Sequence, residues 1–138
     1  VGKFKAALPG GVSTKFVTQL DVPIDVPSLV DVGSLPGTGA VVVLNDTVSM
    51  VDAAKNCVKF FADESCGKCT PCREGTHRAY EILDRFSHME GSLDDLGLLR
   101  ELHAVMYDTA NCGLGQSALN PVISAIDKFE DEFKRCIG

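Results

Sequence analysis

The sequence predicts an α+β fold in which a small sheet-based module precedes an up-down bundle of four helices. Two observations support this prediction. Residues 1–48 are rich in valine, glycine and proline and contain short apolar runs that end at turn signals. From Ser49 onward, apolar residues recur at the spacing of amphipathic helices, and short polar segments separate these stretches. We therefore expect one domain over residues 1–48 and a helical domain over residues 49–138.

In the first domain, residues 3–8 and 40–44 are predicted strands, each closed by a turn signal. Residues 16–20 fit a third strand or a short helix equally well. The G-x-G at residues 37–39 lacks the rest of a dinucleotide-binding fingerprint. A turn that enters the strand at residues 40–44 explains these glycines better than a phosphate site does.

Each of the four predicted helices starts with residues that are favoured at a helix N-terminus. These are Ser49 with Asp52, Thr70 as N-cap with Pro71, Ser92 with Asp95, and Asn120 with Pro121. Gly91 is expected to end the second helix. The predicted inward faces consist of Val51, Ala54, Val58 and Phe61; Ala79, Ile82, Leu83 and Phe86; Leu96, Leu99, Leu102 and Met106; and Val122, Ile126, Phe129 and Phe133.

Three cysteines, Cys66, Cys69 and Cys72, lie within seven residues in the stretch ESCGKCTPCREGT, between the first two helices. In an up-down bundle, the loop between helices three and four lies at the same end, and it contains Cys112. The topology therefore predicts that Cys112 joins the other three.

The two remaining cysteines are too far away along their helices. Cys57 precedes Cys66 by nine residues, which is about 13 Å of helix, and Cys136 lies about 22 Å down the fourth helix. Cys57 is more simply a small core residue. The three histidines, His77, His88 and His103, have no ligand spacing relative to one another, so they are expected to be ordinary helix residues.

Four thiolates spaced C-x2-C-x2-C-x39-C favour a [4Fe–4S] cluster, which needs one thiolate per iron corner. Structural zinc more often uses two separated pairs of ligands. Zinc, free thiols and disulfides remain as alternatives at this point. Lys68 and Arg73 flank the cysteines and could offset the cluster's negative charge or be ordinary solvated cations.

Composition excludes several function classes. The formal net charge is −6 and the basic residues are scattered, which argues against a nucleic-acid-binding surface. No apolar run approaches the roughly 20 residues needed to span a bilayer. We recognise no signal peptide and expect a reducing compartment, either the cytoplasm or the matrix-side peripheral arm of a respiratory complex.

The stretch ESCGKCTPCREGT, followed some forty residues later by CGLGQSALNP, closely resembles the C-terminal region of the NADH-binding flavoprotein subunit of respiratory complex I. Related subunits occur in NAD-coupled hydrogenases and formate dehydrogenases, and the wording of CGLGQSALNP is slightly more like theirs. LPGGVST and LPGTGAVVVLND resemble the small β-grasp (ubiquitin-like), soluble-ligand-binding module of that family. Residues 49–138 resemble its helical iron–sulfur domain.

The resemblance implies that Cys66, Cys69, Cys72 and Cys112 bind one [4Fe–4S] cluster. In the family, this cluster takes single electrons from FMN that NADH has reduced, and passes them to iron–sulfur centres of partner subunits. The family's FMN and NAD(H) sites lie in a preceding α/β domain that this sequence lacks. By resemblance, this chain alone should neither bind FMN in the family's manner nor oxidise NADH. The implied partners are the FMN- and NADH-binding domain of the parent protein and the other iron–sulfur subunits of the complex.

Two alternatives compete with an electron-transfer module. In the first, zinc holds the four thiolates and the chain is a structural or interaction module. In the second, the β-grasp part binds a small ligand or docks a partner while the cluster is structural. We find no paired carboxylates and no nucleophile–base pair that indicate independent catalysis.

Overall fold

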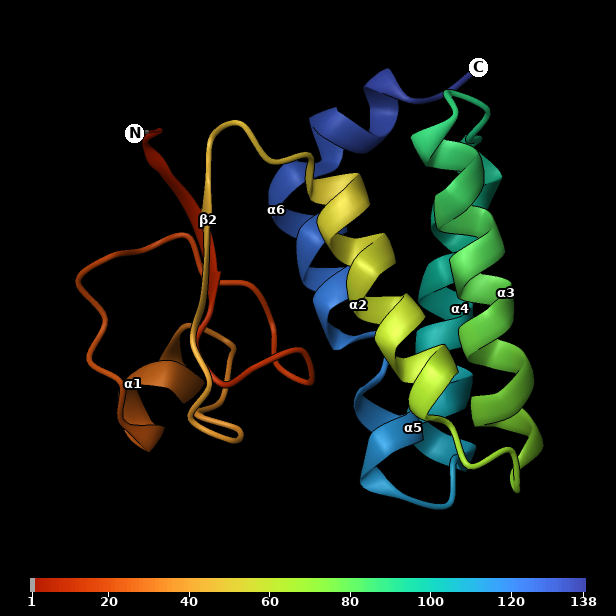
Figure 1. Cartoon of the computed structure of the whole chain (residues 1–138), viewed down its shortest axis with the longest axis horizontal. Helices are drawn as coiled ribbons and strands as arrows, with labels where there is room; N and C mark the ends of the chain where they lie inside the picture. The colour runs from red at the N-terminus through yellow and green to blue at the C-terminus, as the bar shows by residue number, and fades with distance from the viewer. Residues whose placement is uncertain (1) are drawn as a thin grey trace.

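The computed structural model describes residues 2–138 and confirms the α+β class (Figure 1). Within these residues, the elements follow one another as β1 (Phe4–Leu8), α1 (Val26–Asp31), β2 (Val42–Asn45), α2 (Met50–Glu64), α3 (Thr70–Ser87), α4 (Leu93–Thr109), α5 (Gly113–Ser117) and α6 (Asn120–Arg135). None of the helices in this part of the chain has the length and apolar character needed to cross a membrane.

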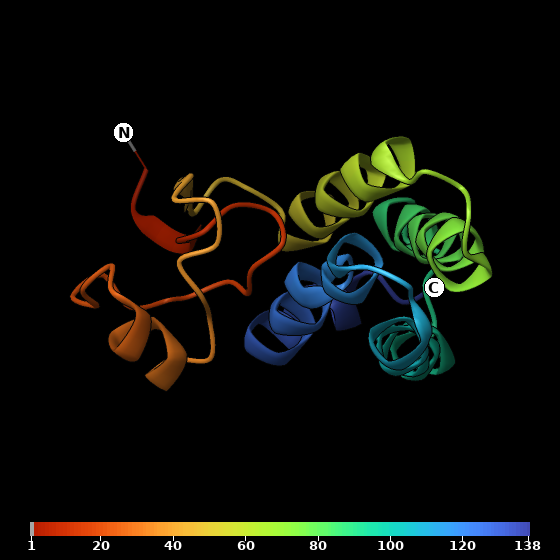
Figure 2. The same ribbon diagram turned by 90° about the horizontal axis from the view of Figure 1, so that it is seen from below.

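Four of the helices form the bundle. α2 packs on α3 and α6, and α4 packs on the same two helices. The four helices therefore form a four-cornered arrangement, with the N-terminal module beside it (Figure 2). The α2–α3 loop and α5 lie together at one end of the bundle. The α3–α4 turn and the C-terminus lie at the other (Figure 1).

The bundle core forms from the predicted inward faces. Phe86 and Phe133 are both fully buried, and their rings meet edge to face with centroids 5.7 Å apart. Leu102 and Phe129 are only partly buried against this core. Phe129 also has non-helical backbone angles, which kink α6. The same core extends into the N-terminal segment through the buried side chains of Ala6, Leu8 and Phe16.

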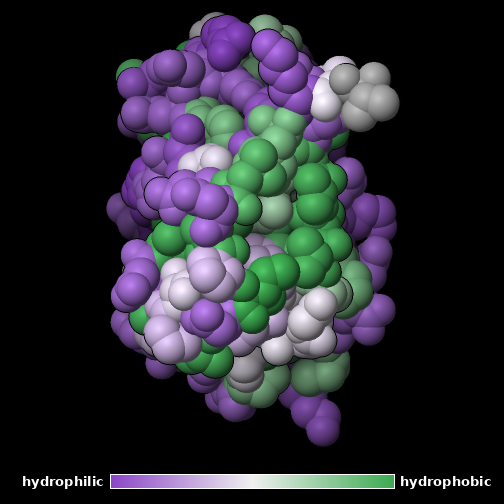
Figure 3. Space-filling view, turned by 90° about the vertical axis from the view of Figure 1, so that its left-hand side faces the viewer, coloured by the Kyte–Doolittle hydropathy of each residue, from purple (hydrophilic) through white to green (hydrophobic). Residues whose placement is uncertain are grey.

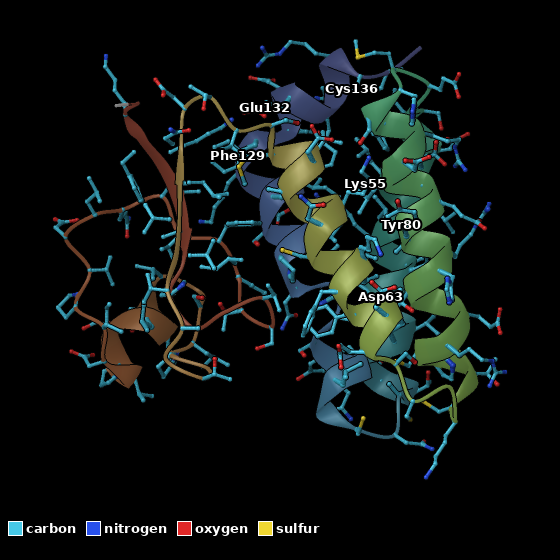
Figure 4. All side chains as sticks on the ribbon, viewed as in Figure 1. Lys55, Asp63, Tyr80, Phe129, Glu132 and Cys136 are labelled. Carbon is cyan, nitrogen blue, oxygen red and sulfur yellow. The ribbon has the colours of Figure 1, made fainter. Side chains whose placement is uncertain are left out.

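Polar contacts also attach the N-terminal segment to the bundle. The Lys5 ammonium lies 2.6 Å from a carboxylate oxygen of Glu132 on α6, and Glu132 also accepts the N–H of Met50 at the start of α2 (Figure 4). The Phe16 N–H donates to the Ser124 hydroxyl at 2.9 Å. These bonds position the segment before α2 against α2 and α6.

The sheet contains two antiparallel strands, with Ala6 opposite Leu44 and Leu8 opposite Val42. Residues 16–20 form neither a strand nor a helix. Val17 alone makes a bridge to Ala7. α1 was not predicted, although Asp25 caps it by accepting the Ser28 N–H.

The G-x-G forms a turn. Gly37 has a φ of +47°, and a Cβ atom there would lie 2.1 Å from the carbonyl oxygen of Gly10. Only glycine fits such an approach, because the contact is with rigid backbone. The absence of a side chain at Gly37 therefore allows two loops of the N-terminal segment to approach each other closely.

Two predicted helix ends are wrong by a few residues. The N-cap of α3 is Cys69, and Thr70 is already the first helical residue. At the other end, α3 stops at Ser87, and Met89, not Gly91, has the positive φ of 62°. Gly91 is needed for packing instead, because a Cβ there would lie 2.3 Å from the Phe86 ring.

Exposed apolar side chains gather on the N-terminal module, where a hydrophobic area occupies the middle of the face in Figure 3. The exposed apolar residues of this module are Leu20, Ile24, Val26, Val30, Leu35, Val41, Val42 and Val43. Leu20 is the most exposed of them at 74%, and Val43, on an edge strand, is 64% exposed. Contiguous exposed apolar area of this kind is typical of a surface that another polypeptide covers.

Candidate metal centre

The structure brings Cys66, Cys69, Cys72 and Cys112 to the same end of the bundle. Cys66 and Cys69 lie in the α2–α3 connection, Cys72 lies in the first turn of α3, and Cys112 is the N-cap of α5. Cys72 is buried and Cys69 half-buried, while Cys66 and Cys112 are exposed. We call this set the four-cysteine end.

A backbone hydrogen bond joins the two loops. The Asn111 N–H, next to Cys112, donates to the sulfur of Cys69 and lowers the pKa of the Cys69 thiol. The Cys72 N–H acts in the same direction, as does the nearby Arg73 charge, against a smaller opposing effect of burial. The sulfur of Cys69 therefore lies where N–H groups from both loops stabilise a thiolate.

The Cys72 thiol has the opposite shift. Burial is the main factor that raises its pKa, and the neighbouring thiols of Cys69, Cys112 and Cys66 add to it, while a hydrogen bond with Ser65 works against it. All three other cysteines are thus close enough for their charges to affect Cys72. Metal ligation deprotonates thiols, and the positive charge of bound iron would offset the repulsion between the resulting thiolates.

Small residues let the two loops approach. A Cβ atom on Gly115 of α5 would lie 2.6 Å from the Cβ of Ala110 and 3.0 Å from the Cβ of Cys72. The Gln116 side chain then closes the connection by donating to the Ala110 carbonyl at 3.0 Å. α5 therefore packs directly against the start of α3.

A short helix separates Cys112 from the last helix of the bundle. α5 lies between Cys112 and α6, and Asn120 at the start of α6 bonds to the Ser13 carbonyl and to His103. The α3 N-terminus follows Cys69 directly, whereas α5 comes between Cys112 and the α6 N-terminus.

The donor set is four cysteine sulfurs, which is the ligand set of an iron–sulfur cluster. Between residues 2 and 138, no group of three or more His, Cys, Asp or Glu side chains is already arranged to hold a metal ion. A cubane spreads the thiolates over four separate iron corners, and its negative charge matches N–H donors such as those at Cys69.

The two remaining cysteines lie away from the four-cysteine end, whereas Arg73 lies beside it. Cys57 is buried in the middle of α2, where burial raises its pKa to about 11. Cys136 is the C-cap of α6 at the opposite end of the bundle (Figure 4). The Arg73 guanidinium bonds to the Gly67 carbonyl at 2.6 Å and to Glu74 at 2.8 Å.

Sequence reasoning missed two contributors to this end: Ser65 and the Asn111 N–H. Ser65 and Asn111 each directly precede a cysteine, which was the available signal. Their hydrogen bonds depend on how the loops pack, which spacing alone does not reveal.

Comparison with known proteins adds to this geometry. The sequence model of the NADH-ubiquinone oxidoreductase-F iron–sulfur binding region matches residues 52–136. The chain is 45% identical over 133 residues to the NADP-reducing hydrogenase subunit HndC of Solidesulfovibrio fructosivorans, covering 95% of this chain and 27% of that protein. It is 37% identical over 135 residues to a subunit of the NADH-quinone oxidoreductase of Escherichia coli, covering 96% of this chain and 30% of that protein.

A solved structure has the same fold. The NAD+-reducing [NiFe]-hydrogenase in the H2-reduced state superposes with a TM-score of 0.87 at 28% identity, over 99% of this chain and 24% of the hydrogenase chain. The present chain thus spans under a third of the length of these relatives.

Proposed function

Because this chain belongs to the family of the NADH-ubiquinone oxidoreductase-F iron–sulfur binding region, we propose that it is a one-electron relay with a single [4Fe–4S] cluster. Cys66, Cys69, Cys72 and Cys112 are the proposed ligands. When bound, such a cluster supplies a centre that gains and loses one electron at a time.

The contact between the two cysteine-bearing loops is the observation that carries this proposal. A Cβ on Gly115 of α5 would lie 3.0 Å from the Cys72 Cβ, and the Asn111 N–H lowers the pKa of the Cys69 thiol, so the loop of Cys112 lies against the loop of the other three cysteines. Three ligands are local in sequence, and the fourth comes from the segment between α4 and α5 at the same end of the bundle. This arrangement supports a cluster whose position is fixed by three helices, α3, α4 and α5.

The protein has two tasks in this role. It holds the cluster at a defined place, and it adjusts the potential through hydrogen bonds to sulfur, burial and local charge. Cys72 is buried while Cys66 and Cys112 are exposed, so one side of the cluster would face the interior and another the surface. The exposed side would allow a close approach by electron partners.

We propose that the rest of the parent protein supplies the electron donor. The relatives named above are a subunit of an NADP-reducing hydrogenase and a subunit of an NADH-quinone oxidoreductase. Each is about three to four times as long as this chain. FMN in another domain of the parent would take hydride from NADH, and two single electrons would then leave by way of the cluster. The exposed apolar residues of the N-terminal module support a covering partner of this kind, because they leave apolar area in water.

Metal and sulfide analysis tests the proposal. Protein prepared without oxygen should contain about four irons and four acid-labile sulfides per chain. Cys112→Ala should lose most of both, while Cys136→Ala, the same change at the opposite end of the bundle, should keep them. One zinc without sulfide would instead support the structural alternative, and equal loading of the two variants would remove Cys112 from the ligand set.

A further inference from the structure

We propose that Ser65 is a tuning residue, whose hydroxyl donates a hydrogen bond to the Cys72 sulfur and raises the reduction potential of the cluster. This inference rests on the proposed function. It assigns to one side chain a role that neither the cysteine motif nor the comparisons assign.

The protonation state of an iron-bound Cys72 decides which atom donates. The Ser65 Oγ lies 3.3 Å from the Cys72 Sγ. As an iron ligand, Cys72 would be a thiolate without a proton, so the hydroxyl has to be the donor. The same Oγ already accepts the Gly67 N–H at 3.3 Å, which leaves the hydroxyl proton free to point at sulfur.

The surroundings hold Ser65 in this position. Ser65 is the C-cap of α2 with an extended backbone, and its partner Gly67 has a φ of +73°. The Arg73 guanidinium, one residue beyond Cys72, donates to the Gly67 carbonyl at 2.6 Å. The loop that presents Ser65 is therefore tied to the helix that presents Cys72.

The effect on the potential follows from charge. Reduction adds one electron, and therefore one negative charge, to the cluster and its thiolates. A donor hydrogen bond stabilises the more negative form more strongly, and burial of Cys72 removes competing water. Removing the hydroxyl should make the cluster harder to reduce.

The experiment is an anaerobic redox titration of the full chain with dithionite as reductant, followed by the electron paramagnetic resonance signal of the reduced cluster. Ser65→Ala should lower the midpoint potential by about 59 mV, which is a tenfold change in the one-electron reduction equilibrium. Ser65→Thr keeps the hydroxyl and should stay close to the wild type. Ser117→Ala removes another hydroxyl at this end of the bundle, one that donates to the Gly113 carbonyl at 2.7 Å, and should leave the potential unchanged.

Each outcome decides the matter. An unchanged potential in Ser65→Ala, at iron and sulfide contents equal to the wild type, would overturn the tuning role. Ser65→Val differs from Ser65→Thr by a methyl group in place of the hydroxyl. If Ser65→Ala and Ser65→Val lose the cluster while Ser65→Thr and Ser117→Ala keep it, Ser65 holds the loop and does not tune. Absence of the cluster from the wild type would instead refute the proposed function, so the two failures are distinguishable.

Discussion

Gly115 offers the sharpest test of how the two cysteine-bearing loops pack. In Gly115→Ala, the new methyl group would lie 2.6 Å from the Ala110 Cβ and 3.0 Å from the Cys72 Cβ. Both neighbours are Cβ atoms, which cannot swing aside like the end of a long side chain. The backbone of α5 or of the α3 N-terminus has to move.

Gly113→Ala is the matched control, because it lies in the same short helix and a Cβ there would meet nothing within 4 Å. Replacing glycine by alanine inside a helix stabilises it by up to about 1 kcal/mol. This gain is common to both variants. The difference between their free energies of unfolding therefore isolates the cost of overpacking at Gly115, about 1–3 kcal/mol.

Urea unfolding of the iron-free protein, followed by circular dichroism under reducing conditions, measures this difference. With an m value of about 2 kcal/mol/M, the midpoint of Gly115→Ala should lie roughly 0.5–1.5 M below that of Gly113→Ala. Gly115→Ala should also bind less iron, because Cys72 is displaced. Equal midpoints and equal iron contents would refute the packing that we describe for α5.

Three further results are expected. Asp95→Asn should cost about 0.5–2 kcal/mol, because the carboxylate completes the Ser92 capping box. Burial raises the Asp95 pKa, but hydrogen bonds outweigh this effect, so the folded-state pKa is lowered. The Asp95 contribution to stability, measured by urea midpoints, should therefore be fully present above about pH 4 and be lost as the pH falls below that. Phe133→Ala should cost about 3–5 kcal/mol in the same assay, because its ring is fully buried. In the iron-free protein at pH 8, mass spectrometry should find exposed Cys66 alkylated quickly and Cys57, with a pKa of about 11, only after unfolding; rapid labelling of Cys57 would contradict its buried position.

The bundle was predictable because its sequence signals are long and consistent. Each of the four helices spans at least fifteen residues, so the apolar period repeats several times and identifies the inner face. Capping residues added the starts: Ser92 and Asp95 form the predicted reciprocal capping box. The up-down order of the helices then placed Cys112 beside the α2–α3 loop without any knowledge of the side-chain packing.

The shorter elements were not predictable in the same way. α5 has five residues and α1 has six, which is too short for a period to show. Gly91 illustrates a different limit, because glycine is a common helix stop, yet here the chain needs it beneath the Phe86 ring. That requirement depends on a contact between packed residues, and the local sequence does not contain it.

The same limit applies within the candidate site. The sequence alone identifies four candidate sulfur ligands, because the type and number of ligand residues can be read from it directly. The groups that would set the potential are the Ser65 hydroxyl, which contacts Cys72 from the end of α2, and the Asn111 N–H, which reaches Cys69 because the two cysteine-bearing loops lie against each other. A relative could therefore keep all four cysteines and still differ in potential, since a change at Ser65 or Gly115 alters the surroundings of Cys72 and leaves the ligand set intact.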